Sequence, residues 1–112
     1  MVGQNILEHP AAAQYDIVNP SSEDLDLTDF AATQRFMTST NPDVVIHSAG
    51  RVGGIQANMA HPVDFLVTNM DLGRNVIMAA RQAGVPKLIN LASSCMYPRN
   101  VPNPLSETLV LQ

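Results

Sequence analysis

Two short aliphatic runs on either side of a long helical pattern constrain the fold of this chain more than any other feature. Val44–His47 and Lys87–Asn90 are typical of strands in a parallel sheet. Between them, a 3.6-residue spacing predicts a helix over 62–82, with Pro62 in its first turn and Gly84 just beyond its end. This β-α-β alternation predicts an α/β fold with a doubly wound parallel sheet.

The first 40 residues predict smaller elements. We expect a short helix over 1–13, limited by Pro10, and a brief strand over 15–18. An extended segment is expected over 24–27, followed by a helix over 29–38 with Thr28 as its N-cap.

The predicted long helix has an apolar stripe with two unusual members. Asn69 is predicted either to tie down the loop after the preceding strand or to lie at the margin of the stripe. Gly73 lowers helix propensity, which suggests that a strand packs closely against it. The stripe consists of Leu66, Asn69, Gly73, Val76, Ile77 and Ala80.

Small polar residues follow both predicted strands. Ligands bind outside the carboxyl ends of strands in open α/β sheets, so Ser93, Ser94 and Cys95 are candidate site residues. A buried strand end would place them at low dielectric. Taken alone, the glycine-rich loop over 48–55 is equally consistent with a ligand loop or an ordinary one. Arg51 slightly favours a ligand loop, because its cation is expected to open toward the same crevice as Ser93. His47 is expected to be a core histidine.

Charge and composition exclude several classes of function. The net charge is −4, with seven acidic residues against Arg35 alone in residues 1–50, and five basic against three acidic residues in 51–112. With no basic stripe and 4% aromatic residues, we expect no nucleic-acid partner. The sequence lacks a long apolar run, so we expect a soluble, cytoplasmic protein. Cys95 is the only cysteine, so no metal site is expected.

Several short motifs follow one another in the second half of the chain. They are Val52-Gly53-Gly54-Ile55, Ala57-Asn58, Pro62, Asp64-Phe65, Asn69-Met70, Ser93-Ser94-Cys95 and Tyr97-Pro98. In this order and spacing they resemble the GDP-L-fucose synthases, a branch of the extended short-chain dehydrogenase/reductase family (NAD-dependent epimerases and dehydratases). The resemblance implies a Rossmann-like fold. It also implies an oxidoreductase and isomerase that epimerises C3 and C5 of GDP-4-keto-6-deoxy-D-mannose and reduces C4 to give GDP-L-fucose.

The resemblance implies roles for two residues after the second strand. Cys95 matches the base of the epimerisation, and Ser93 matches the serine that hydrogen-bonds the C4 oxygen. Protons beside a ketone can be removed when a base takes them and a donor stabilises the enolate oxygen, so the residue chemistry agrees.

The implied cofactor is NADP, and NAD stays open. At Ser22 the family usually has an arginine for the 2′-phosphate, and hydroxyls in this loop bring no charge. An acidic residue here favours a free ribose, and a basic one favours a phosphate. The implied cofactor-binding residues are Gly3, Ser22, Glu23, Asp24, Leu25, Asp26, Leu27, Leu91, Ala92, Ser93 and Ser94.

We expect residues 1–112 to be a partial NAD(P)-binding Rossmann domain. The family's G-x-x-G-x-x-G motif is matched only at its last glycine, Gly3, so the first strand is expected to be absent. The Tyr-x-x-x-Lys pair and the substrate domain are also unmatched, and the chain alone is expected to be inactive. A complete enzyme is expected to be a homodimer that takes a nucleotide sugar. The alternatives are a non-catalytic nucleotide-binding or interaction remnant and another nucleotide-sugar epimerase or reductase.

Overall fold

The computed structural model describes residues 2–110, with every side chain among them except that of Ser94. The first part of the chain forms α1 (Val2–Glu8), the 3-10 helix η1 (Pro10–Gln14) and α2 (Phe30–Thr40). Next come β1 (Val44–His47), α3 (Ile55–Ala60), α4 (Pro62–Gln82) and β2 (Lys87–Asn90). Two further 3-10 helices, η2 (Ser94–Met96) and η3 (Glu107–Leu109), follow β2.

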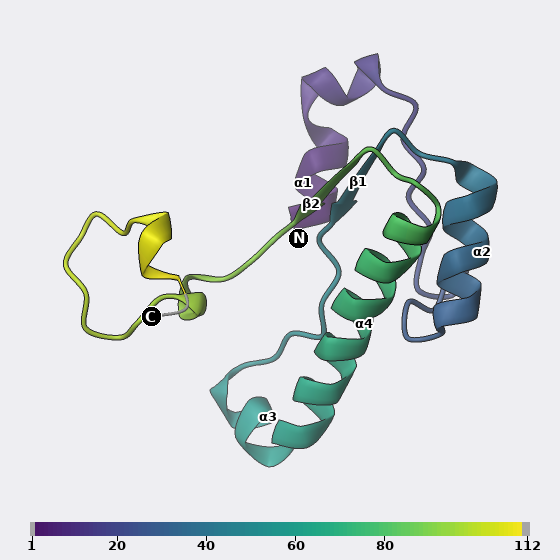
Figure 1. Ribbon diagram of the computed structural model, residues 1–112. Coiled ribbons are helices and arrows are strands. Elements are labelled where there is room, and N and C mark those ends of the chain that lie inside the picture. Colours follow the sequence, from purple (N-terminus) through teal and green to yellow (C-terminus); the bar gives the residue numbers. More distant parts are fainter. Residues whose placement is uncertain (1, 111–112) are drawn as a thin grey trace.

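The two strands form a parallel pair, which confirms the predicted α/β class. Val44 pairs with Lys87 and His47 with Asn90. Figure 1 shows α1 on one side of the strands and α2 with α4 on the other, as in a doubly wound sheet. The carboxyl ends of both strands therefore lie at one edge of the sheet.

The core lies where α4 packs against α2. Ala79 is fully buried and Val76 almost so, and both lie in one cluster with Met37 of α2. Small side chains at positions 79 and 80 let the two helices approach closely. The partly buried residues that pack on this cluster are Leu27, Phe30, Val45, Ala83 and Leu88.

The ends of α4 confirm the sequence prediction, but the start of α2 does not. Pro62 is the first residue of α4, and Gly84 follows its end with φ of +73°. For α2 the N-cap is Asp29 rather than Thr28, because Asp29 Oδ1 accepts the N–H of Ala32 at 3.0 Å. The Thr28 hydroxyl instead donates to Asp26.

The strand predicted over 15–18 does not form, and the segment predicted to be extended over 24–27 lies partly in turns. Residues 15–18 lie outside any sheet, and Tyr15 is 71% exposed. A strand requires a neighbour to pair its backbone, and within residues 2–110 β1 pairs with β2 alone. Residues 24–27 join two turns, one at 22–24 and one at 27–28, because side-chain hydrogen bonds curl the backbone there.

The buried face of α4 is rotated from the predicted one. Leu66 is 60% exposed and Ile77 is also exposed. A Cβ added to Gly73 would meet nothing within 4 Å, so the predicted close strand contact is wrong. The face is set by where α2 packs, which the helix's own spacing does not reveal. The buried residues of α4 are Phe65, Asn75, Val76, Ala79 and Ala80.

None of the helices between residues 2 and 110 combines the length and the apolar character that a membrane crossing requires.

Candidate functional site

Ser93 and Cys95 come together in a tight turn just beyond β2. The backbone N–H of Cys95 donates to Ser93 Oγ at 3.2 Å, and the N–H of Met96 donates to the Ser93 carbonyl at 3.1 Å. Since Ser93 Oγ accepts in this bond, its own hydroxyl proton is left to donate to a ligand. The Ser94 side chain, also a predicted site residue, lies outside the described residues.

The predicted burial of this turn is wrong, because both Ser93 and Cys95 are exposed. Leu91 and Ala92, which lead into the turn, are exposed as well. Figure 1 shows the chain after β2 leading away from the helices, so none of them covers the turn. The thiol and hydroxyl are therefore open to solvent.

A hollow of about 450 Å³ lies beside the thiol. Tyr97, Arg99 and Asn103 line it together with Cys95. These groups offer one nucleophilic sulfur, hydrogen-bond donors and a cation, which suits a polar anionic ligand. The residues that line it are Cys95, Tyr97, Pro98, Arg99, Val101, Asn103 and Leu105.

The predicted cofactor loop over 22–27 is anionic and partly anchored. The hydroxyl and backbone N–H of Ser21 donate to Asp24 Oδ2, at 2.6 and 3.2 Å, and hold the pKa of that carboxyl below its usual value. Thr28 does the same for Asp26 through its hydroxyl at 2.7 Å and its N–H at 2.8 Å, which lowers the pKa of Asp26. Leu25 is buried, so the loop is held to the protein between two ionised carboxylates.

Gly3 lies against the loop that follows β1. A Cβ at this position would come within 3.1 Å of Ser48 Oγ, closer than ordinary contact. The absence of a side chain thus lets α1 approach the carboxyl end of β1 closely. Two groups of predicted cofactor residues thus lie at the carboxyl edge of the sheet. Gly3 lies against the loop after β1, and the exposed residues 91–93 follow β2.

The loop after β1 is fixed to α4 rather than opened toward Ser93. Asn69 Oδ1 accepts the N–H of Arg51 at 2.8 Å, which confirms that this amide ties down the loop, although Asn69 itself is exposed. The Arg51 guanidinium lies over the ring of Phe65, 4.8 Å from its centroid. A cation–π contact of this kind directs the side chain onto α4.

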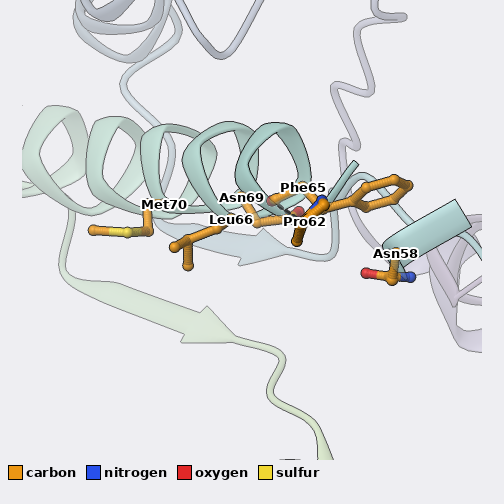
Figure 2. Close-up of a pocket in the computed structure, with 6 residues that line it drawn as sticks. All are labelled: Asn58, Pro62, Phe65, Leu66, Asn69 and Met70. Carbon is orange, nitrogen blue, oxygen red and sulfur yellow. Dashed lines mark hydrogen bonds between the residues drawn. The ribbon is translucent and has the colours of Figure 1, made fainter. Parts of the chain in front are cut away.

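A larger hollow, of about 570 Å³, lies along α4 and contains none of the predicted site residues. Figure 2 shows Leu66 and Met70 along α4 and Asn58 facing the helix start from α3. The helical spacing could not have revealed this hollow, because it placed Leu66 on the predicted buried stripe, whereas Leu66 is exposed. The residues that line the hollow are Asn58, Pro62, Phe65, Leu66, Asn69 and Met70.

His47 is buried at the end of β1, as predicted, and burial lowers its pKa. Within residues 2–110, no three histidine, cysteine or acidic side chains are grouped as metal ligands would be.

The residues present fit a dinucleotide in part. Gly3 lies against Ser48 at the carboxyl edge of the sheet, the edge where phosphates approach glycine-lined turns in dinucleotide-binding folds. The 22–27 loop offers a hydroxyl at Ser22 and carboxylates for a ribose. It offers no lysine or arginine for a 2′-phosphate, since the first such residue of the chain is Arg35.

Comparison with known proteins gives consistent matches over the whole chain. The sequence profile of the "NAD dependent epimerase/dehydratase family" matches residues 1–111. A GDP-L-colitose synthase of Yersinia pseudotuberculosis is 44% identical over 111 residues, covering 99% of this chain and 36% of that protein. A GDP-L-fucose synthase of Azorhizobium caulinodans is 44% identical over 112 residues, covering all of this chain and 36% of that protein.

A solved structure supports the fold. The GDP-L-fucose synthetase of Naegleria fowleri bound to NADP matches with a TM-score of 0.79 and 29% identity, covering 96% of this chain and 33% of that one. The chain spans about a third of the length of the curated relatives it matches.

Proposed function

Because the chain belongs to the NAD dependent epimerase/dehydratase family, we propose that it is part of a GDP-sugar epimerase and reductase. Residues 1–112 would form part of its NAD(P)-binding Rossmann domain. The proposed reaction is that of the GDP-L-fucose synthases: epimerisation of GDP-4-keto-6-deoxy-D-mannose at C3 and C5, then reduction at C4. The 44% identity to a GDP-L-fucose synthase over the whole chain supports this choice.

The single observation that carries the proposal is the Ser93–Cys95 turn beyond β2. Cys95 would take the proton from the carbon beside the ketone, and the Ser93 hydroxyl would donate to the ketone oxygen as negative charge builds on it. The hydrogen bond from the N–H of Cys95 to Ser93 Oγ orients the serine for that donation. Both groups are exposed, so a sugar can reach them.

The cofactor would be a nicotinamide dinucleotide, which supplies the hydride for the reduction when it is bound. We propose that Gly3, the 22–27 loop and residues 91–94 hold it. The NADP in the Naegleria fowleri structure supports NADP as the form. NAD is the alternative form, because the family includes NAD-dependent enzymes and no lysine or arginine precedes Arg35.

A homodimer is part of the proposal. Val63, Leu66, Val67 and Met70 leave an exposed apolar strip along α4. A second copy could bury such a strip, as exposed apolar patches often mark interfaces. Sedimentation of the complete protein tests this, and a monomer at all concentrations would contradict it.

The test of the reaction is a chimera in which this chain replaces the matching third of the Azorhizobium caulinodans enzyme. In D₂O with the keto sugar and NADPH, the chimera should introduce deuterium at C3 and C5 and form the reduced sugar. Cys95→Ser should stop deuterium incorporation while ketone reduction persists. A folded chimera that reduces the ketone and incorporates deuterium equally well with Cys95→Ser would contradict the role of the thiol.

A second candidate is a non-catalytic module that binds a partner through the sheet. Its support is that β1 and β2 each have a single strand neighbour within residues 2–110, and Val44 and Ile46 are exposed. Open strand edges readily pair with other chains. Catalysis by the chimera decides against this candidate.

A further inference from the structure

Asn75 is a buried polar residue of α4 whose side chain reaches the turn before α2. It is only 1% exposed. Its Nδ2 donates to the carbonyl oxygens of Leu27 at 2.9 Å and Thr28 at 2.8 Å. Its Oδ1 is buried with no hydrogen-bond partner among the described residues. Burying an amide oxygen without a partner is costly, and the two bonds made by Nδ2 give the amide a role that an apolar side chain could not fill.

The carbonyls that Asn75 holds belong to the anionic loop. The Thr28 N–H and hydroxyl both donate to Asp26, so fixing the peptide at positions 27 and 28 also fixes the Asp26 carboxylate. Leu25, the residue before Asp26, is buried and anchors the same loop. In Figure 1 this segment turns just before the start of α2, beside α4. The loop is thus set from α4, nearly fifty residues away in sequence.

We propose that Asn75 is a positioning residue for the adenosine end of the dinucleotide. It holds the 22–28 loop in the conformation that binds the ligand, and it does not touch the ligand. This inference rests on the proposed function, which assigns residues 22–27 to the cofactor. A loop that is ordered before binding loses less freedom when the ligand arrives, so Asn75 raises affinity through the loop.

The experiment compares the same change at two amides of α4. Asn75→Leu removes the donor to the loop. Gln82→Leu removes an exposed amide that also bonds α2, through Gln34, but lies far along the helix from the loop contacts. Calorimetry on the chimera described under the proposed function, with 5′-AMP, NAD⁺ and NADP⁺, should show about tenfold weaker binding for Asn75→Leu. Gln82→Leu should bind like the unsubstituted chimera.

The outcomes separate this inference from the proposed function. Unchanged 5′-AMP affinity in Asn75→Leu overturns the inference and leaves the cofactor site in place. An unsubstituted chimera that binds neither dinucleotide overturns the cofactor site and the inference with it.

A second measurement needs no substitution at position 75 and so does not depend on the variant folding. In the unsubstituted chimera, the side-chain amide resonance of Asn75 should shift when 5′-AMP is titrated in, while that of Gln82 stays. An Asn75 resonance that stays unmoved while 5′-AMP binds also overturns the inference.

Discussion

The side chain of Asn69 pairs with the backbone of Arg51 in both directions. The N–H of Arg51 donates to Asn69 Oδ1 at 2.8 Å, and Asn69 Nδ2 donates to the Arg51 carbonyl at 3.0 Å. The same Nδ2 donates to the carbonyl of Phe65 within α4 at 2.9 Å. The amide therefore satisfies both polar groups of one loop residue and attaches that residue to the helix.

Asn69→Ala should release the loop after β1. The loss of these hydrogen bonds should lower the free energy of unfolding by about 1–2 kcal/mol, measured by urea denaturation. Hydrogen exchange at the Arg51 amide should become faster. Asn58→Ala is the control, because Asn58 donates to the carbonyls of Gly53 and Gly54 and leaves Arg51 untouched. Equal exchange at Arg51 in both variants would contradict the assignment.

Two glycine-to-alanine changes should affect the stability of the fold in opposite directions. Gly73 lies inside α4 with open space around it, so Gly73→Ala should raise stability by about 0.5–1 kcal/mol through helix propensity. Gly84 has φ of +73°, where a Cβ is strained, so Gly84→Ala should lower stability by about 1 kcal/mol. Thermal melts of both variants check this, and a loss of stability at Gly73 would show that a neighbour closes on that face.

His47 should make the chain less stable below neutral pH. Burial lowers its pKa from the ordinary 6.5, so the folded state favours the neutral ring. As the pH falls, the unfolded chain takes up this proton first. The contribution of the neutral His47 ring to the free energy of unfolding is therefore complete above pH 6.5. It is lost as the pH falls through the lower pKa of the folded state.

The measurement is the urea midpoint of unfolding across this range, compared with His47→Gln. The variant should show a flatter pH profile, since His9 and His61 are present in both proteins. Parallel profiles would assign the pH dependence to another group.

Ser22→Arg should shift the chain toward NADP⁺. The turn around Ser22 contains ionised Asp24 and Asp26 and no cation. A guanidinium there can pair with a 2′-phosphate, and charged hydrogen bonds of this kind correspond to roughly tenfold or more in affinity. Calorimetry should show a higher ratio of NADP⁺ to NAD⁺ affinity. Ser22→Gln adds similar bulk without charge, and a similar rise in that variant would rule out an electrostatic cause.

Local signals in the sequence were enough to predict the β-α-β unit. Aliphatic runs mark β1 and β2. Pro62 and Gly84 mark the ends of α4, because proline fixes its own φ angle and glycine allows a positive one. The failed predictions depend on distant partners. Residues 15–18 have strand-like composition but no neighbouring strand to pair with among residues 2–110, and the buried face of α4 depends on where α2 packs.

The candidate site divides in the same way. That Ser93 and Cys95 lie just after a strand could be predicted from the sequence, but their exposure could not, and their roles stay predictions. Asn75 was missed because one amide among apolar helix residues gives no sign of the turn it bonds, 47 and 48 positions earlier. Such contacts are set by tertiary packing.

The parallel register of β1 and β2 also bears on how this chain folds. Val44 meets Lys87 across a connection that includes the whole of α4, so no tight hairpin can start the pairing. Closing so long a loop is entropically costly, and contacts of high sequence separation slow folding. A helix that forms first shortens the segment that must close. The folding rate should therefore be more sensitive to helix-breaking changes in the exposed middle of α4 than to changes at the strand edges.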